Sequence, residues 1–306
     1  MKTIFRIIFW CAVFAALALL FARLAPAQSQ PLRDESACLT LLNGNSAESV
    51  TVAEYLPGAL AAEMPVSFGL EALKAQAVAI RTYALRGGGH PDGDICIRSD
   101  CCLAYKTGAE LRALWGDDYG ANMQTVLEAV RETDGQYLTY GGELIEAVFH
   151  ASSAGLTEDS AAVWSAQPYL ISVASPETAD SVPELLSTAR FSPAELSAAL
   201  SIAPTGEPDT WLGDITLDSA GRVASAVIGG TVFSGKTLRS ALGLRSTAFT
   251  VSFEGGEFVF SVAGFGHGVG MSQYGAKLLA AEGWSYEDIL AHYYPGTALS
   301  KLPLAA

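Results

Sequence analysis

One carboxylate in this sequence stands out by its surroundings. Glu63 lies between Ala62 and Met64-Pro65 and has few polar neighbours along the chain. Because desolvation raises the pKa of a carboxyl group, such a glutamate keeps its proton closer to neutrality and can donate it. The ordinary alternative is a glutamate that is solvated or that caps the helix after it. The residue types therefore make Glu63 a candidate general acid.

A glycine-rich stretch, residues 264–270 (GFGHGVG), follows a predicted strand and opens a predicted helix. It fits neither the dinucleotide-binding fingerprint nor the P-loop, which needs a lysine. Residues 270–275 miss the nucleophile elbow by one residue after the serine. What remains is a loop whose backbone can approach a ligand closely, or a plain strand-to-helix turn with positive φ angles. His267 within the loop favours a functional role.

The cysteines allow two interpretations. Outside the apolar amino-terminal segment the chain has Cys38, Cys96, Cys101 and Cys102. Adjacent cysteines are poorly placed for a bridge between themselves, so a thiolate cluster that binds zinc is a serious interpretation. Disulfides, with Cys38 as one partner, are the alternative, and the sequence favours neither.

These residues must be positioned by helices and hairpins. Residues 70–86 carry an apolar stripe with spacings of three and four, which predicts an amphipathic helix ended by glycines 87–89. Lys74 and Arg81 are seven residues apart on that helix and so share a face. By default this face is solvated, and Glu71 is spaced to pair with Lys74.

Hairpins and further helices follow in blocks. Strand-forming residues flank short glycine-containing turns in three places, and a capping box starts a helix at 192–200. Two more helices are predicted, at 272–282 and 285–293. Since hairpins and helices do not strictly alternate, the pattern predicts an α+β fold. The predicted hairpins are 136–140 with 143–150, 214–217 with 222–228, and 249–253 with 257–263.

The amino terminus has the pattern of an export or anchor segment. Residues 7–22 are uninterruptedly apolar, with Lys2 and Arg6 before them. We expect a signal-anchor or signal peptide at 1–27, a linker at 28–49 and a folded domain at 50–300. The positive charge ahead of the apolar run predicts that the domain lies on the outer face of the cytoplasmic membrane, anchored by 7–22, or is secreted if the segment is cut near Ala25-Pro26-Ala27.

The net charge of −14 excludes some partners. Nucleic acids recruit basic faces, so a nucleic-acid partner is not expected. An intact acidic polymer is also disfavoured, and the few cations in a cleft would matter individually.

Several segments together resemble the stage II sporulation protein D (SpoIID) family, and the resemblance runs from about residue 50 to 299. They are residues 52–58 (VAEYLPG), 61–65 (AAEMP), 70–83 (LEALKAQAVAIRTY), 149–155 (FHASSAG), 264–276 (GFGHGVGMSQYGA) and 292–297 (HYYPGT).

The resemblance implies a peptidoglycan lytic transglycosylase that acts in septal wall remodelling during forespore engulfment and prefers strands stripped of stem peptides. It implies an α+β domain with a glycan-binding cleft and Glu63 as catalytic acid and base. A mechanism of this kind needs one carboxyl group, and Glu158 and Asp159 are the nearest candidates for a second. The resemblance also makes the following residues candidate substrate contacts: Lys74, Arg81, Tyr83, Ser152, Ser153, His267, Gln273 and Tyr274.

The family's metal pattern is cysteine, four residues, histidine, cysteine. Cys96 and Cys102 match it, and Cys101 stands where the family has histidine, so the resemblance implies a structural zinc site held by these three residues, with no fourth ligand visible. A second departure is Ala151 and Ala154 in a stretch that is usually richer in serine and glycine.

Partners are implied by the same resemblance. They are peptidoglycan glycan strands, a sporulation amidase of the SpoIIP type, a membrane scaffold of the SpoIIM type, and the cytoplasmic membrane through the amino-terminal helix. Two other classes of function compete with the enzyme. One is a non-catalytic wall-binding amidase enhancer, and the other is an anchored scaffold for other sporulation proteins.

Overall fold

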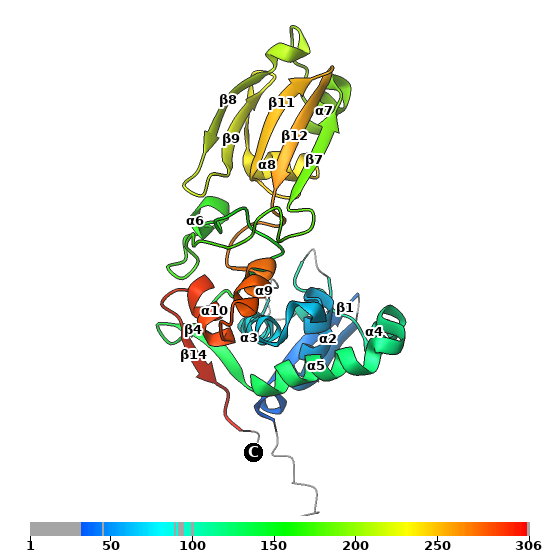
Figure 1. Cartoon of the computed structure of the whole chain (residues 1–306), viewed down its shortest axis with the longest axis vertical. Coiled ribbons are helices and arrows are strands. Elements are labelled where there is room, and N and C mark those ends of the chain that lie inside the picture. Colours follow the sequence, from blue (N-terminus) through cyan, green and yellow to red (C-terminus); the bar gives the residue numbers. More distant parts are fainter. Residues whose placement is uncertain (1–31, 45, 89, 91–94, 99–100, 305–306) are drawn as a thin grey trace, which may run out of the picture. The chain divides into compact units, whose positions relative to one another are not determined.

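The computed structural model describes residues 32–44, 46–88, 90, 95–98 and 101–304, which belong to one folded unit that begins at Leu32 (Figure 1). The predicted export or anchor segment, residues 7–22, lies outside the described residues. Within the described part, no helix is both long enough and apolar enough to span a bilayer.

The larger of two hydrophobic clusters is built on helices, with α3 packed against α2, α5, α9 and α10 (Figure 1). Helix α3 is buried along most of its length, so its two faces meet different neighbours. The helices of this cluster are α2 (Val52–Glu63), α3 (Leu70–Arg86), α4 (Gly108–Trp115), α5 (Tyr119–Glu132), α9 (Gln273–Ala281) and α10 (Tyr286–Tyr293).

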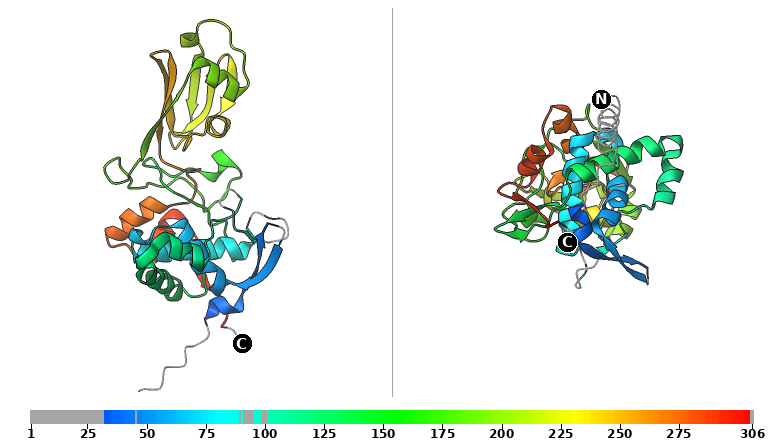
Figure 2. Two further views of the ribbon diagram at one scale, coloured as in Figure 1. Left: turned by 90° about the vertical axis from the view of Figure 1, so that its right-hand side faces the viewer. Right: turned by 90° about the horizontal axis from the view of Figure 1, so that it is seen from below.

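Three small sheets border these helices. Their strand orders are β2-β1-β3, β14-β4-β5 and β13-β6, and the first includes the hairpin drawn in blue in Figure 2. In the last, Met271 and Ser272 pair in parallel with Phe149 and His150. The strands are β1 (Cys38–Asn43), β2 (Ser46–Thr51), β3 (Ile95–Cys96), β4 (Gln136–Tyr140), β5 (Glu143–Leu144), β6 (Phe149–His150), β13 (Met271–Ser272) and β14 (Ala298–Lys301).

The second hydrophobic cluster lies between two antiparallel sheets, β10-β9-β8 and β11-β12-β7, and two short helices. Phe258 and Phe260 of β12 are fully buried in it, as their alternation on one strand face predicts. The elements are β7 (Leu186–Phe191), α7 (Pro193–Leu200), β8 (Leu212–Leu217), β9 (Val223–Ile228), β10 (Thr231–Ser234), α8 (Gly235–Ala241), β11 (Phe249–Glu254) and β12 (Glu257–Ala263). The short helix α6 (Ser160–Val163) lies in the segment before them.

The mixed helices and strands confirm the α+β class. The helix at 70–86, the capping box at Ser192 and the hairpins around 141–142 and 255–256 all form as predicted. The strand predicted at 143–150 is wrong beyond Leu144, because residues 149–150 pair with β13 instead.

The predicted linker at 28–49 is also too long. Residues 33–43 and 46–49 are part of the folded unit, as the short 3₁₀ helix η1 (Arg33–Ser36) and the hairpin of β1 and β2. Asp34 is fully buried within η1. Only its polar, aperiodic sequence suggested a linker, and a polar segment folds when one of its side chains has a buried partner.

Helix α2 ends at Glu63 for a reason visible in the sequence. Pro65 disfavours a helical conformation at the residue before it, and Met64 is accordingly extended, with φ −131° and ψ 129°. At the other end, Thr51 and Glu54 form a capping box. Glu63 is therefore the last residue of α2 and does not cap the helix after it, which begins at Leu70.

Candidate active site

Glu63 is held in a largely buried position by a backbone amide. The N–H of Ala104 donates to Glu63 Oε1 at 2.5 Å. Burial raises the pKa of the Glu63 carboxyl, and the hydrogen bond from Ala104 offsets part of that rise. The result is a carboxyl group that retains its proton at a higher pH than an exposed glutamate, as a general acid requires.

The segment that supplies Ala104 lies across α2. Lys106 N donates to the carbonyl of Gly58 at 3.3 Å, and Tyr105 stacks on Tyr55 with ring centroids 5.6 Å apart. A Cβ at Gly58 would meet the Tyr105 ring at 2.5 Å. The glycine therefore permits the close approach that brings the Ala104 amide to Glu63.

Helices α3 and α9 complete the surroundings of Glu63. Gln273 Nε2 donates to the Glu63 carbonyl at 3.0 Å and lies 3.4 Å from Gln76 Oε1. The buried Tyr55 hydroxyl has no hydrogen-bond partner among the described residues, and burial, followed by the charge of Glu63, raises the pKa of Tyr55. A buried hydroxyl without a partner, next to a carboxyl group whose pKa is raised, needs an explanation, and a functional site would provide one.

Tyr83 and Tyr274 lie at the margins of this region, both half-buried. Tyr83 is seven residues after Gln76 and shares its face of α3. Burial, followed by the charge of Cys102, raises the pKa of Tyr83 to about 12. Tyr274 packs on Phe68 with 4.8 Å between the ring centroids, and the Lys277 ammonium lies 5.6 Å from the Tyr274 ring centroid.

Lys74 and Arg81 do not fit the predicted cleft contacts. They share a face of α3, as their spacing requires, but it is the face opposite to Gln76 and Tyr83. Lys74 is 8 % exposed and forms ion pairs with Glu71, at 2.6 Å, and with Glu132. Arg81 has no exposed surface.

The Arg81 guanidinium forms two hydrogen bonds of 2.7 Å to Asp34 and one of 2.9 Å to the carbonyl of Gln136. It therefore fastens η1 and β4 to α3. The spacing identified the shared face but could not show which side of α3 faces the site.

This assignment predicts a stability effect without a binding effect. Arg81→Gln should lower the free energy of unfolding by about 3–5 kcal/mol, because it leaves Asp34 buried and uncompensated. Arg190→Gln is the matched control, since its exposed pair with Glu257 at 3.5 Å should contribute at most about 1 kcal/mol. Denaturant titration measures both. If Arg81→Gln had near-normal stability but no longer bound glycan, Arg81 would be a substrate contact after all.

The glycine-rich loop is closely packed on buried side chains. Gly268 has φ +87°, and a Cβ there would lie 2.6 Å from the Arg222 guanidinium carbon. At Gly266 the corresponding neighbour is His150 Cβ, at 2.7 Å. Both positions need glycine for close approach as well as for the sign of φ. The loop is thus built into the protein interior.

His267 is a neutral histidine in this loop. Its Nδ1 accepts from Val269 N at 3.1 Å, and its ring edge meets Trp164 at a centroid distance of 5.2 Å. Burial, followed by the charge of Arg239, lowers the pKa of His267 to about 4. It therefore remains uncharged at neutral pH.

Ser152 and Ser153 are buried and engaged within the protein. Ser152 exchanges backbone hydrogen bonds with Phe265, and Ser153 Oγ lies 2.6 Å from His150 Nε2. Glu177 Oε1 accepts from Ser153 N at 2.9 Å and from the hydroxyl of Ser272, the residue before Gln273. The serines therefore connect the glycine-rich loop to the start of α9.

The described structure does not bring Glu158 or Asp159 into contact with Glu63. Glu158 is 2 % exposed, with its Oε2 3.6 Å from Arg222 Nε, and Asp159 caps α6. Burial, with the nearby charge of Asp218, raises the pKa of Glu158 to about 7. Among the described residues no other carboxylate contributes to the shift in the pKa of Glu63, unlike the paired carboxyl groups of ordinary glycosidases.

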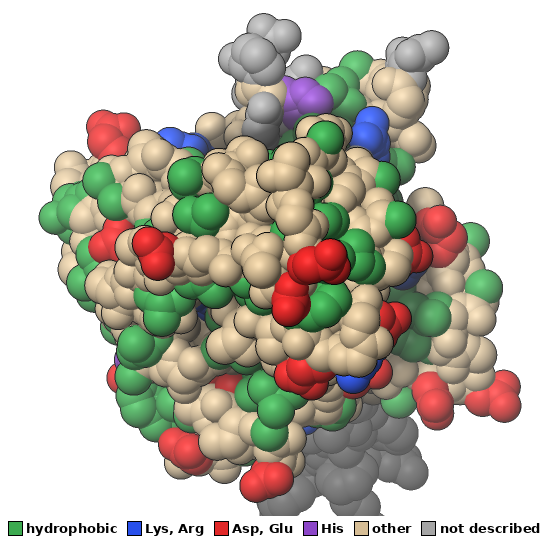
Figure 3. Space-filling view, turned by 90° about the horizontal axis from the view of Figure 1, so that it is seen from above, with side chains coloured by type: hydrophobic (Ala, Val, Ile, Leu, Met, Phe, Trp, Pro, Cys, Tyr) green, Lys and Arg blue, Asp and Glu red, His purple; other side chains and the backbone are tan. Residues whose placement is uncertain are grey.

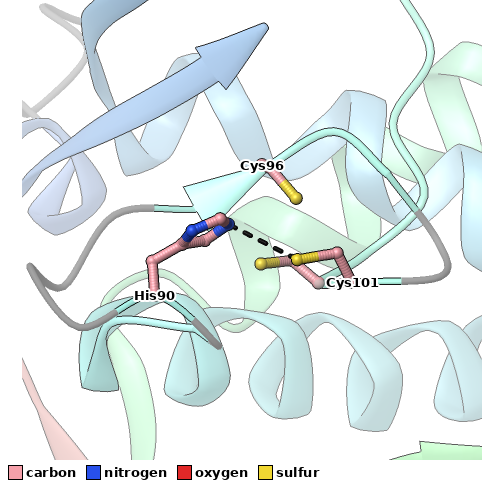
Figure 4. A group of neighbouring side chains, drawn as sticks. His90, Cys96 and Cys101 are labelled. Atoms are coloured by element: carbon pink, nitrogen blue, oxygen red, sulfur yellow. Dashed lines mark hydrogen bonds between the residues drawn. The ribbon is translucent and has the colours of Figure 1, made fainter. Parts of the chain in front are cut away.

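The three predicted metal ligands do come together, and a fourth joins them. The ligand atoms of His90, Cys96, Cys101 and Cys102 all lie within 4.8 Å of one another. Figure 4 shows His90 and Cys101 pointing toward each other, with 3.5 Å between His90 Nε2 and Cys101 Sγ. None of the described cysteines forms a disulfide, and Cys38 is exposed on β1.

This cluster could hold a metal ion. One imidazole and three thiols match the Cys₃His donor set of structural zinc sites, which need separations of this size for tetrahedral coordination. Burial opposes ionisation of Cys96, but hydrogen bonds from His90, from the Arg98 backbone and from the other two thiols lower the pKa of Cys96 to about 7. Such a thiol is readily converted to the thiolate that binds metal.

Sequence reasoning missed three residues that matter here. His90 was the available signal for the fourth ligand, since the chain has four histidines and this one precedes the cysteines. Asp34 gave no signal beyond its charge. Ala104 could not have been found, because it acts through its backbone.

Fold and site together define an α+β protein in which a backbone amide, two residues from a His/Cys cluster that could bind a metal ion, holds the largely buried Glu63 carboxyl. The model of the SpoIID family, described as "Stage II sporulation protein", matches residues 43–140. The chain is 42 % identical over 267 residues to stage II sporulation protein D of Bacillus amyloliquefaciens, covering 85 % of this chain and 77 % of that protein. It therefore belongs to the SpoIID family, which is involved in sporulation.

Two further relatives come from Bacillus subtilis (strain 168). Its stage II sporulation protein D is 40 % identical over 264 residues, covering 84 % of this chain and 76 % of that protein. Its "Amidase enhancer" is 31 % identical over 304 residues, covering 80 % of this chain and 40 % of that longer protein.

Proposed function

We propose that the protein is a peptidoglycan lytic transglycosylase in which Glu63 is both acid and base. The observation that carries this proposal is the largely buried Glu63 carboxyl at the end of α2, with its raised pKa and its hydrogen bond from the Ala104 amide. A mechanism with one carboxyl group fits this arrangement, whereas hydrolysis by two carboxylates does not.

In this reaction Glu63 gives up one proton and takes one back. The protonated carboxyl gives its proton to the bridging oxygen that leaves the N-acetylmuramic acid residue. The resulting carboxylate then takes the proton of the C6 hydroxyl of the same sugar, whose oxygen bonds to C1 and closes a 1,6-anhydro ring. Glu63 ends protonated, as it began, and no water is consumed.

The other residues around Glu63 would position it and contact the strand. Gln273 fixes the Glu63 backbone, while the half-buried rings of Tyr83 and Tyr274 are available for sugar contacts. Ser152, Ser153 and His267 would support the glycine-rich loop from within. The metal cluster would hold residues 103–106, and therefore the Ala104 amide, against α2.

The family's involvement in sporulation indicates a role at the cell envelope. We extend the proposal to a protein on the outer side of the cytoplasmic membrane that acts on glycan strands in septal remodelling during engulfment. The expected partners are an amidase of the SpoIIP type and a membrane scaffold of the SpoIIM type.

Mass analysis of the sugar products from purified glycan strands tests the activity. A transglycosylase yields products that end in 1,6-anhydro-N-acetylmuramic acid, whereas a hydrolase yields reducing ends. Absence of both products from a folded protein that binds strands would reject the enzyme.

A second candidate is a non-catalytic amidase enhancer, favoured by the similarity to the amidase enhancer of B. subtilis. It predicts strand binding without cleavage and an increased rate of a sporulation amidase. The Glu63→Gln protein separates the two functions, because an enhancer would keep its full effect on the amidase.

We also expect strands stripped of stem peptides to be cleaved faster than intact peptidoglycan. The net charge is −14, and on the face drawn in Figure 3 acidic side chains are widespread and basic ones are few. Repulsion of stem-peptide carboxylates acts over a Debye length of about 8–10 Å, and one like-charge contact in water costs about 1 kcal/mol, or about fivefold in rate.

Initial rates on amidase-treated and untreated strands, at low and high ionic strength, measure this preference. Equal rates on both would contradict it. A preference that persists unchanged in high salt would assign it to the shape of the site. Amidation of the stem-peptide carboxyls is the matched control and should remove the part due to repulsion.

A further inference from the structure

A cavity lies beside the glycine-rich loop, and Glu63 is not among the residues that line it. Its volume is about 270 Å³. Its walls come from the segment around α6, the turn between β8 and β9, helix α8 and the loop itself. The side chains that give it chemical character are Glu158, Trp164, Asp218, Lys236, Arg239 and His267.

Two cations on α8 face this cavity without an anionic partner. Arg239 is half-buried and Lys236 is exposed, and neither has a hydrogen bond or ion pair to any described residue. Burial lowers the pKa of the Arg239 guanidinium. A partly desolvated arginine is usually paired, and its planar donors match a carboxylate. Arg239 is thus available to bind an anion that does not come from the described part of the chain.

The wall behind these cations adds positive charge. Arg222 is 1 % exposed, and its three side-chain nitrogens have no hydrogen-bond partner among the described residues, although Glu158 lies 3.6 Å from its Nε. Burial and the nearby Asp218 raise the pKa of Glu158 to about 7, so the two carboxyls carry less than their full negative charge at neutral pH. Positive groups therefore outnumber negative ones at and behind this cavity, whereas the whole protein has a net charge of −14.

An aromatic side chain borders the same cavity. Trp164 is 40 % exposed, and only its contact with the neutral His267 ring, at 5.2 Å, fixes it against another aromatic group. Aromatic faces of this kind pack against the C–H groups of a sugar ring while the sugar's polar groups reach neighbouring side chains. A cation pair next to an open tryptophan suits a sugar that carries a carboxylate.

We propose that this cavity binds a carboxylate-bearing sugar of the glycan strand, with Arg239 and Lys236 pairing with the carboxylate and Trp164 covering the sugar ring. The inference rests on the proposed function. In a strand, the lactyl group of N-acetylmuramic acid carries a free carboxylate only after its stem peptide has been removed, because the peptide is attached there as an amide. The cavity would thus recognise stripped strands by the group that stripping exposes.

The cavity and Glu63 are close enough to act on one strand. His267 lines the cavity, and Gln273, which hydrogen-bonds to Glu63, follows it by six residues. Six residues span at most roughly 20–22 Å when fully extended. A strand of several sugars can therefore occupy both places.

Binding to the Glu63→Gln protein, which leaves the strand uncut, tests the inference by calorimetry. The probes are stripped strands, stripped strands whose lactyl carboxyls have been converted to amides, and strands that keep their stem peptides. We expect stripped strands to bind roughly tenfold to hundredfold more tightly than their amidated form, the range of a charge-assisted hydrogen bond. Strands with stem peptides separate the two sources of carboxylate, and they should bind as weakly as the amidated form.

Substitutions on α8 assign the effect to the cavity. Arg239→Gln should abolish the difference between stripped and amidated strands, Lys236→Gln should reduce it, and Arg239→Lys should keep part of it. Arg190→Gln, on β7, is the control that should change nothing. Thermal melting shows whether each variant is folded, and the exposed Lys236 provides a second variant if Arg239→Gln does not fold.

Equal binding of stripped and amidated strands, or the same loss for both in Arg239→Gln, would overturn the inference. Product analysis keeps its failure separate from that of the proposed function. If the parent protein forms anhydro products but binding does not depend on the lactyl carboxylate, only the role of the cavity is rejected. If binding depends on the lactyl carboxylate but no products form, only the proposed catalysis is rejected.

Discussion

The Glu63→Gln protein should fold, bind glycan strands and form no anhydro product. The glutamine keeps the shape of the side chain and an oxygen that accepts from Ala104 N, but it has no proton to donate. General acid-base catalysis contributes about 10²–10⁴-fold per proton transfer, and Glu63 would serve both transfers. The rate of anhydro product formation, measured by mass analysis, should fall by at least about 10²–10⁴-fold.

Glu282→Gln, at the exposed end of α9, is the matched control and should leave the rate unchanged. Near-normal product formation by Glu63→Gln would move catalysis elsewhere. Glu158→Gln would then be the next variant to test, because burial raises the pKa of that carboxyl as well.

The raised pKa of Glu63 also predicts how the stability of the protein changes with pH. The folded state favours the protonated carboxyl, so its pKa in the folded protein exceeds that in the unfolded chain. The associated stability is complete below the unfolded pKa and is lost as the pH rises through the folded one. Glu63→Gln should therefore lose less stability than the parent protein as the pH rises over this range. The activity of the parent should fall over the same range, because Glu63 loses the proton that it donates.

Removal of metal should have the second largest effect. Reduced protein is expected to carry about one zinc per chain through His90, Cys96, Cys101 and Cys102. Apparent binding free energies of structural zinc are about 10–16 kcal/mol in small domains, so chelation should lower the melting temperature markedly. Activity should fall as well, because Ala104 is only two residues from Cys102.

Metal analysis, thiol counting and melting curves measure this expectation, and added zinc should restore both properties. Cys102→Ser should behave like the chelated protein, whereas Cys38→Ser, which changes an exposed cysteine outside the cluster, should not. Disulfides without metal, or a chelated protein with unchanged melting and activity, would contradict the zinc assignment.

The sequence predicted local structure well where the signal was local. Helix 70–86 ends at Gly87 because glycine adopts the left-handed conformation found there, with φ 102°, and three hairpins follow their turn residues. The sequence predicted a role for Glu63 but not that it ends a helix, although Pro65 is the local signal for that end, because it disfavours a helical conformation at Met64.

Long-range pairing was not predictable from the same signals. Periodicity showed that Lys74 and Arg81 share a face but not that this face packs on Asp34 and Glu132. Parallel pairing of β6 with β13 joins residues more than a hundred positions apart, and no local pattern encodes it. The cysteine cluster was found because its ligands are neighbours in the chain, and His90 was missed because it lies outside the spacing of the family pattern.

The contact between Ala104 and Glu63 has a consequence for how this protein tolerates mutation. The donor is a main-chain N–H, so every residue except proline would supply it at position 104. Scanning side chains one at a time would leave this contact undetected, and natural sequence drift at this position would be silent with respect to it. Only an amide-to-ester replacement at residue 104 removes the donor alone, and it should raise the pKa of Glu63 further while leaving the rest of the chain chemically intact.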